Sequence, residues 1–215
     1  MLESSYHERL WEAVPEGAEA PNEEPRRAFL LARAGALAAG EERPLRVLDV
    51  GCGEGRSTAE LQRAGFTAVG VDVAEEPLRR ARARDPELDL RRVPVEGPWP
   101  IGDASFDVVW AGETIEHVAD TSGWLSEVRR VLRSGGSLLL STPAHGRLRL
   151  LALALSARRF DAHFDPRSDH LRFYTRRTLA RLLEDFGFEQ IDVREAGCFP
   201  GARRFLLTSA IRSRF

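Results

Sequence analysis

The stretch from Leu45 to Asp72 limits most strongly what this chain can fold into. The run Leu45–Val50 is short, apolar and partly β-branched, as in a buried parallel strand. A glycine turn and a helix-like segment, Arg56–Arg63, follow it, and a second apolar run, Thr67–Val71, ends at Asp72. A strand, a glycine turn and a helix leave free backbone N–H groups beside a ligand, and an acid ending the next strand can accept both hydroxyls of a ribose.

The spacing of the glycines at 51, 53 and 55 separates this turn from other nucleotide-binding loops. Dinucleotide-binding folds use Gly-x-Gly-x-x-Gly, whereas here the third glycine comes one residue early. The chain contains no Gly-Lys-Ser/Thr, so a triphosphate-binding loop is unsupported. A tight turn without a ligand stays open for the glycines alone. Together with Asp72, the pattern predicts a nucleoside cofactor.

These residues resemble the class I S-adenosylmethionine-dependent methyltransferases. Residues 47–55 look like the first motif of that superfamily, and Val71-Asp72-Val73 looks like its ribose-binding acid. The resemblance continues at 105–110, 132–138 and 141–143. It implies S-adenosylmethionine as cofactor, and Glu96 stands where many relatives carry an adenine-binding Asp. The cofactor-binding residues that it implies are Asp49, Gly51, Cys52, Gly53, Gly55, Asp72, Val73, Glu96 and Ala111.

Strands and helices alternate from residue 45 onward, which predicts an α/β fold with a parallel sheet covered on both faces. The resemblance implies a Rossmann-like, doubly wound, seven-stranded and mostly parallel sheet whose last strand is antiparallel. We expect strands near 45–50, 67–72, 89–93, 106–111 and 136–142, a final hairpin of 188–195 and 204–211, and helices near 56–64, 75–84, 121–133 and 175–186.

Two segments fall outside this alternation. Residues 1–40 form a helical leader, with helices expected at 6–14 and 26–39, and the methyltransferase domain then spans 41–215. The leader either packs over the cofactor or covers only an edge of the sheet. Residues 144–170 contain the apolar segment Leu148–Ala157, which we interpret as part of a lid above the carboxyl ends of the strands. A buried packing helix is the alternative.

The segment after the fourth strand carries the residues that could perform chemistry. On one helical turn, Glu113, Glu116 and His117 would converge, and His170 is a fourth candidate ligand. Two carboxylates and an imidazole suit magnesium or manganese. The Glu-x-x-Glu-His pattern at 113–117 resembles that of the O-methyltransferases of ubiquinone biosynthesis, where these residues bind magnesium. It also resembles that of the small-RNA 2′-O-methyltransferases, which add a later histidine to the ligand set.

Metal-free relatives carry a similar Glu-His-Val pattern, in which the histidine acts as a base or hydrogen-bond partner. We therefore expect His117 to deprotonate the methyl acceptor and Glu113 to orient His117 or the substrate. A metal held by Glu113, Glu116, His117 and His170 stays open. The expected reaction is methyl transfer to a small molecule, at oxygen rather than nitrogen or carbon. The alternatives are a metal-dependent small-RNA 2′-O-methyltransferase and a non-catalytic cofactor-binding scaffold.

Composition narrows the partners of the chain. With 215 residues and a formal net charge of −2, it has the size of one domain and no basic field that would recruit nucleic acid. Its two cysteines, Cys52 and Cys198, form no disulfide framework. The N-terminus is unlike a secretory signal, and no apolar run is long enough to span a bilayer. These features predict a cytoplasmic protein without a membrane span, and they do not indicate an oligomeric state.

Overall fold

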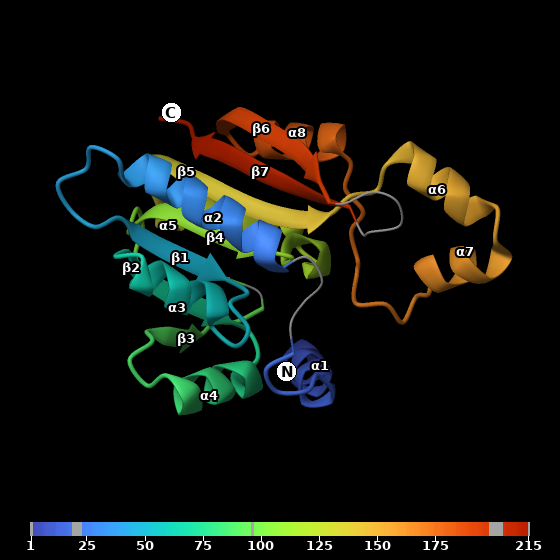
Figure 1. Cartoon of the computed structure of the whole chain (residues 1–215), viewed down its shortest axis with the longest axis horizontal. Helices are drawn as coiled ribbons and strands as arrows, with labels where there is room; N and C mark the ends of the chain where they lie inside the picture. The colour runs from blue at the N-terminus through green and yellow to red at the C-terminus, as the bar shows by residue number, and fades with distance from the viewer. Residues whose placement is uncertain (1, 19–22, 96, 198–203, 215) are drawn as a thin grey trace.

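The computed structural model describes residues 2–18, 23–95, 97–197 and 204–214. Within these residues, strands of one sheet alternate with helices (Figure 1). The strands are β1 (Arg46–Val50), β2 (Thr67–Asp72), β3 (Leu90–Arg92), β4 (Phe106–Gly112), β5 (Leu132–Pro143), β6 (Phe188–Ala196) and β7 (Phe205–Arg212). The helices are α1 (Leu2–Ala13), α2 (Glu23–Ala38), α3 (Arg56–Arg63), α4 (Glu75–Arg84), α5 (Thr121–Val131), α6 (Arg147–Ala154), α7 (Ala157–His163), α8 (Arg176–Asp185) and the 3-10 helix η1 (Ile115–His117).

The described strands form a seven-stranded sheet in the order β3-β2-β1-β4-β5-β7-β6. Strands β1 to β5 pair in parallel, and β7 lies antiparallel between β5 and β6. The predicted doubly wound sheet with an antiparallel last strand is therefore confirmed.

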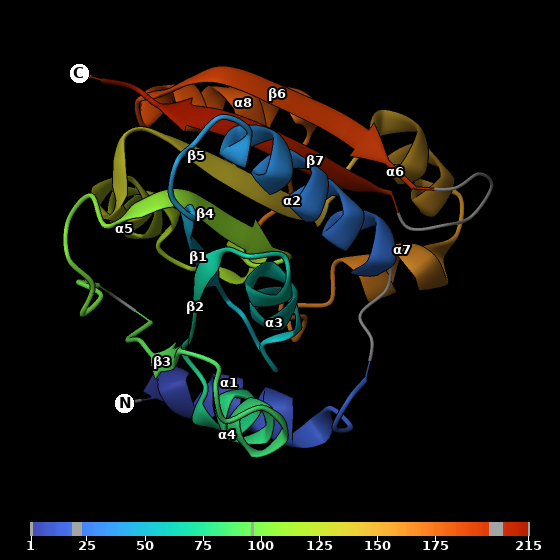
Figure 2. The ribbon, with the colours of Figure 1, turned by 60° about the vertical axis from the view of Figure 1, so that its left-hand side comes forward.

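Helices cover both faces of the sheet (Figure 2). On one face, Leu30 of α2 and Leu61 of α3 pack against Val47 of β1. On the other, Leu125 of α5 belongs to a cluster with Leu48, the next residue of the same strand. Because successive side chains of a strand point to opposite faces, an apolar strand such as β1 supplies both layers of the core.

The carboxyl ends of the central strands meet at one edge of the sheet. Val50 pairs with Val71, and Asp49 pairs with Trp110. This register brings the glycine turn after β1, Asp72 at the end of β2 and the segment after β4 to the same edge, where open α/β sheets bind ligands.

Two expected boundaries were wrong. The helix predicted over 121–133 ends at Val131, because the chain passes directly into β5, which begins before Gly135 rather than after it. Gly135 has a φ of 74° there, and the register of β5 against β4 shifts between Phe106 and Val108. The apolar segment Leu148–Ala157 is not helical throughout: it forms most of α6, and Ser156 stands in extended conformation at the N-cap of a second helix, α7.

Candidate functional site

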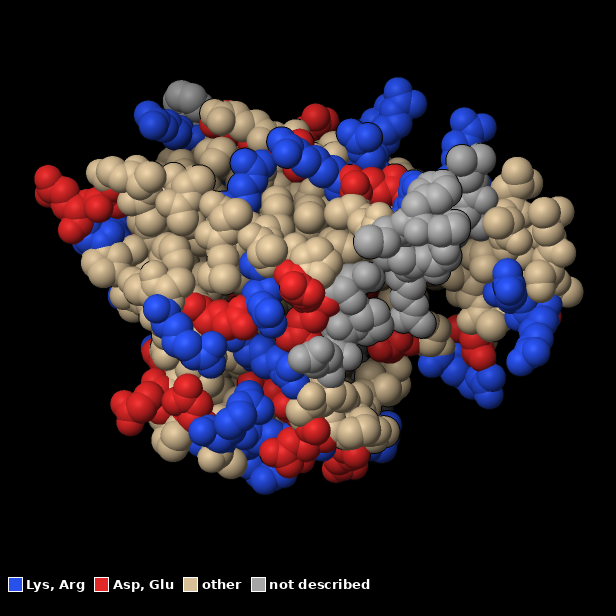
Figure 3. All heavy atoms as spheres, viewed as in Figure 1, with Lys and Arg blue, Asp and Glu red and all other residues tan. Residues whose placement is uncertain are grey.

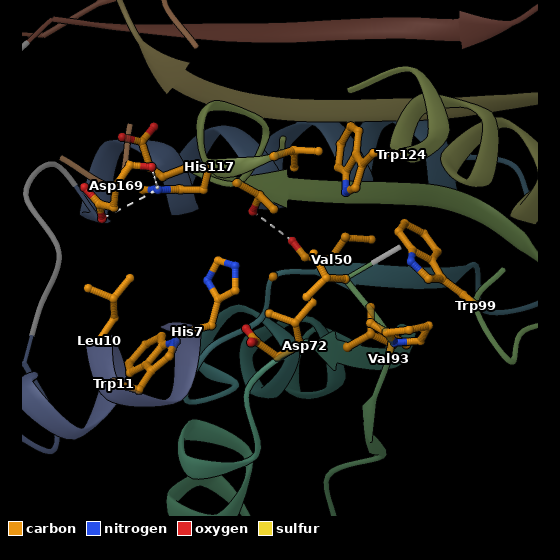
Figure 4. Close-up of a pocket in the computed structure, with 18 of the residues that line it drawn as sticks. His7, Leu10, Trp11, Val50, Asp72, Val93, Trp99, His117, Trp124 and Asp169 are labelled. Atoms are coloured by element: carbon orange, nitrogen blue, oxygen red, sulfur yellow. Dashed lines mark hydrogen bonds and ion pairs between the residues drawn. The ribbon is translucent and has the colours of Figure 1, made fainter. Parts of the chain in front are cut away.

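A cavity opens at the carboxyl ends of β1, β2 and β4 (Figure 4). Its walls are largely apolar, and its polar side chains come from four separate segments: α1, the end of β2, the segment around η1 and the segment before α8. A second cavity adjoins it over the glycine turn, since the two share lining residues. The first cavity is lined by His7, Leu10, Trp11, Val14, Val50, Gly51, Val71, Asp72, Val73, Val93, Pro94, Val95, Trp99, Glu113, Thr114, His117, Val118, Trp124 and Asp169.

The glycine turn needs glycine for conformation and for space. Gly51, Gly53 and Gly55 have φ values of 71°, 52° and 69°, which side chains rarely adopt. A Cβ atom at Gly51 would lie 2.5 Å from Oγ1 of Thr114. Gly51 and Gly53 border the cavities, whereas Gly55 stands at the N-cap of α3 and borders neither. The turn therefore brings bare backbone to the cavity wall.

Asp72 is held at the cavity wall by two backbone hydrogen bonds. Its Oδ2 accepts the N–H of Gly53 and its Oδ1 accepts the N–H of Ala74, both at 2.9 Å. Burial raises the pKa of Asp72, which is 6% exposed, and the two N–H groups oppose that shift. Each oxygen keeps lone pairs for a ligand in the cavity. Val73 follows it and also lines the cavity.

Asp49 lies beneath the turn rather than in the first cavity. Its Oδ2 accepts a hydrogen bond from the hydroxyl of Thr58 at 2.7 Å, and burial raises its pKa to about 7. Asp49 and Cys52 border the second cavity. Ala111 is fully buried in the core and borders neither cavity. Glu96 lies outside the described residues.

His117 faces the first cavity from η1 and is oriented by Asp169. Its Nδ1 lies 2.9 Å from the main-chain carbonyl of Asp169 and 3.6 Å from its carboxylate. Because a carbonyl only accepts, Nδ1 carries the proton, and Nε2 is left as an acceptor. Burial lowers the pKa of His117, which favours the neutral ring. A neutral imidazole with a fixed tautomer can take a proton from a ligand.

The expectation that Glu113 shares a helical turn with Glu116 and His117 was wrong. Glu113 has a φ of 53°, and the 3-10 helix begins two residues later. Its carboxylate accepts a hydrogen bond from Ser141 at 2.9 Å and pairs with Arg26 at 3.2 Å. Glu113 therefore borders both cavities, and its carboxylate is engaged by Ser141 and Arg26.

Three of the four expected metal ligands do come together. Glu116, His117 and His170 offer ligand atoms within 4.8 Å of one another. The N–H groups of Leu171 and Arg172 donate to the carbonyl of Glu116, which brings the segment carrying His170 beside η1.

The carboxylate of Glu116 is fully buried, and its two oxygens differ. Its Oε2 accepts a hydrogen bond from Thr142, whereas its Oε1 has no hydrogen-bond partner among the described residues. Burial and the charge of Glu113 raise the pKa of Glu116 to about 8. A buried acceptor beside two imidazoles fits a divalent cation.

Three residues at the site were not predicted from the sequence. Arg26 is 8% exposed and borders the second cavity, yet it lies in a polar stretch with no motif. Asp169 meets His117 from a position 52 residues away. His7 could have been found, because it stands three and four residues before Leu10 and Trp11 on one helix face.

The segment expected to form a lid contributes little to the first cavity. Of residues 144–170, only Asp169 lines it among the described residues. Helices α6 and α7 project beyond the sheet (Figure 1). Residues other than Lys, Arg, Asp and Glu make up much of their surface in Figure 3. Leu151, Leu155 and Phe160 are 61%, 84% and 42% exposed. Among the described helices, none has the length and apolar character needed to cross a membrane.

Comparison with known proteins gives concordant matches. A family model described as a methyltransferase domain matches residues 23–193. A ubiquinone biosynthesis O-methyltransferase of Dinoroseobacter shibae is 34% identical over 154 residues, which are 69% of this chain and 61% of that protein. A probable S-adenosylmethionine-dependent methyltransferase of Mycolicibacterium smegmatis is 36% identical over 156 residues, 73% of this chain and 56% of that protein. The chain thus spans about 60% of the length of these curated relatives.

Solved structures agree on the fold. The YcgJ protein from Bacillus subtilis has a TM-score of 0.64 at 18% identity and covers 87% of this chain and 98% of its own. The 1,6-didemethyltoxoflavin-N1-methyltransferase of Burkholderia thailandensis, solved with bound 1,6-didemethyltoxoflavin and S-adenosylhomocysteine, has a TM-score of 0.62 at 22% identity. The match covers 93% of each chain. At these identities the likeness concerns the fold alone.

Proposed function

The chain belongs to the class I S-adenosylmethionine-dependent methyltransferases, and on that premise we propose that it transfers the methyl group of S-adenosylmethionine to an oxygen atom of a small molecule. One observation carries this proposal. Asp72, the bare backbone of the glycine turn and the neutral imidazole of His117 border a single cavity (Figure 4). A ribose acceptor and a proton acceptor therefore stand on different walls of one space.

The residues around the cavity suit the nucleoside part of the cofactor. Asp72 would accept hydrogen bonds from the ribose hydroxyls, since its oxygens keep free lone pairs. Val73, Val93, Trp99 and Trp124 form an apolar wall that would enclose the adenine ring. The apolar surface favours the flat base, and the carboxylate fixes where the sugar lies.

The second cavity suits the methionine end. Arg26 and Glu113 form an ion pair beside the turn, at 3.2 Å. A zwitterionic amino-acid group could exchange partners with such a pair, its carboxylate binding Arg26 and its ammonium group binding Glu113. Glu113 would then bind the cofactor. The sequence had suggested a different role, in which Glu113 orients His117 or the substrate.

The acceptor step needs a base and exclusion of water. When bound, the cofactor supplies a methyl group on a sulfonium leaving group. Nε2 of His117 would take the proton of an acceptor hydroxyl while the oxygen–carbon bond forms and the carbon–sulfur bond breaks. An oxygen acceptor is supported by this base and by relatives described as O-methyltransferases.

Calorimetry with S-adenosylmethionine tests the cofactor assignment. We expect binding to the wild type and at least a 100-fold loss in Asp72→Ala, because two hydrogen bonds to a charged group disappear. Asp89→Ala, at an exposed acid outside both cavities, should bind as the wild type does. No binding to the wild type, or unchanged binding by Asp72→Ala, contradicts the proposal.

We propose a divalent cation at Glu116, His117 and His170 as an alternative setting for the same reaction. The unsatisfied, buried Oε1 of Glu116 favours it. Magnesium or manganese held there would bind the acceptor oxygen and lower the pKa of its hydroxyl. In that case Nε2 of His117 would be a ligand and could not also be the base. Titration with manganese distinguishes the two: binding that is lost in Glu116→Gln supports the cation, and no binding to the wild type supports the base.

A further inference from the structure

Helix α1 is fastened to α4 at two points. The carboxylate of Glu8 accepts the N–H groups of Glu75 and Glu76, at 2.6 and 3.0 Å, at a helix start whose own N-cap residue, Ala74, has no side-chain cap. Glu8 thereby satisfies donors that a helix start leaves unpaired, and its negative charge suits the positive end of the helix dipole.

The second attachment is Arg80, a buried side chain of α4. It donates to the carbonyls of Trp11 and Val14, at 3.1 and 2.8 Å, at the carboxyl end of α1. Its charge is balanced by Glu76 at 2.8 Å and Glu54 at 3.4 Å. The middle and the carboxyl end of α1 are therefore held against α4, the helix that follows Asp72.

This attachment directs one face of α1 into the first cavity. The face consists of His7, Leu10 and Trp11, spaced as one stripe of a helix, and Val14, directly after the helix, continues the stripe. The other three members are apolar or aromatic, whereas His7 carries ring N–H and acceptor groups. Figure 4 shows His7 in the space between Asp72 and His117.

A carboxylate alone cannot satisfy a ribose. Each ribose hydroxyl is both a donor and an acceptor, and Asp72 only accepts. A hydroxyl that donates to Asp72 therefore still has an oxygen that can accept, and the ring of His7 lines the same cavity as Asp72.

We propose that His7 is a cofactor-binding residue. Its ring N–H would donate a hydrogen bond to the oxygen of a ribose hydroxyl, and the O–H of the same hydroxyl would donate a hydrogen bond to Asp72. The inference rests on the proposed function, because it assumes that a nucleoside occupies the cavity. Glu8 and Arg80 act as positioning residues, since they hold α1 where the ring can reach the sugar.

Binding of adenosine and 2′- and 3′-deoxyadenosine tests this, read from the fluorescence of Trp99 and Trp124 in the cavity wall. His7→Phe keeps an aromatic ring and removes the donor, so we expect about a 10-fold loss of adenosine affinity. Glu12→Ala, on the exposed face of α1, should match the wild type. The analogue that lacks the hydroxyl bound by His7 should bind more weakly than adenosine in the wild type. In His7→Phe the difference in affinity between that analogue and adenosine should become smaller.

The failures are distinguishable. If His7→Phe binds adenosine as the wild type does, or if the loss for both deoxy analogues is the same in variant and wild type, His7 does not contact the ribose. If the wild type binds neither adenosine nor S-adenosylmethionine, the proposed function itself fails.

Discussion

The two sides of the first cavity are built in different ways. The ribose-binding part of the cofactor side comes from a continuous stretch, in which the glycine turn is joined to Asp72 by a hydrogen bond between residues 19 apart. The acceptor side is assembled from distant segments, since His117 is oriented by Asp169, which lies 52 residues further along. A turn that is fixed by its own backbone can be identified from a motif, whereas a side built by tertiary contact cannot.

The same contrast appears in the electrostatics. On the cofactor side, Asp49 and Asp72 each accept hydrogen bonds from neighbouring groups. On the acceptor side, Oε1 of Glu116 has no hydrogen-bond partner among the described residues. We infer that the two acids of the cofactor side are already held by hydrogen bonds, whereas Glu116 on the acceptor side still has an oxygen to satisfy.

The largest effect should fall on the acceptor side alone. We expect His117→Asn to lower the rate of methyl transfer by about 10²- to 10⁴-fold, because the acceptor loses its base or its cation ligand. Affinity for S-adenosylmethionine should change less than about threefold. Methyl transfer is followed by mass spectrometry of a hydroxylated acceptor panel, with Asp89→Ala, at an exposed acid outside both cavities, as the control. An equal loss of cofactor affinity would show that the two sides are not separable.

The second prediction concerns stability on the cofactor side. The pKa of Asp49 is about 7 when folded and 3.8 when unfolded, so the folded state binds the extra proton between these values. Stability should therefore fall as pH rises from 4 to 7, by on the order of a few kcal/mol. Asp49→Asn keeps an acceptor for Thr58 and removes the titration, so the variant should lose that part of the pH dependence.

Urea unfolding of wild type and Asp49→Asn at pH 5 and pH 8 measures this difference. The variant should gain stability over the wild type at pH 8 relative to pH 5. A stability difference that is independent of pH would show that Asp49 stays charged in the folded protein.

The third prediction divides the cofactor between the two cavities. Arg26→Ala should weaken S-adenosylhomocysteine binding by about 10- to 100-fold, since a charged hydrogen bond is lost, and leave adenosine binding unchanged. Arg33→Ala, on the same helix but outside both cavities, serves as the control and should bind both ligands as the wild type does. Equal losses for both ligands would place Arg26 beside the nucleoside, contrary to the proposed division.

The sequence was sufficient for the sheet and for the cofactor side, and it failed where backbone conformation and long-range contact decide. Thr175 caps α8 as its sequence predicts, and Asp72 lies at the end of β2. Glu113 was misplaced because a helical turn was assumed where the chain has a positive φ. Asp169 carried no local signal, since its importance comes from the register between η1 and the segment before α8.

The smallest effect on cofactor affinity is expected at α6 and α7. We propose that these two helices contact the methyl acceptor. Leu155→Ser and Phe160→Ser should leave S-adenosylmethionine affinity within about twofold, because both side chains are exposed and outside the cavities. If the segment closes over the acceptor, the KM for the acceptor should rise while kcat is kept. Weaker cofactor binding would assign α6 and α7 to the cofactor side.

We propose that one cavity places the methyl donor between Asp72 and His117. A crystal structure with S-adenosylhomocysteine tests it most directly. We predict that the ribose hydroxyls bind the carboxylate of Asp72 and that the sulfur lies on the side of the ligand that faces His117. A nucleoside bound away from Asp72, or a sulfur directed away from His117, would contradict the account.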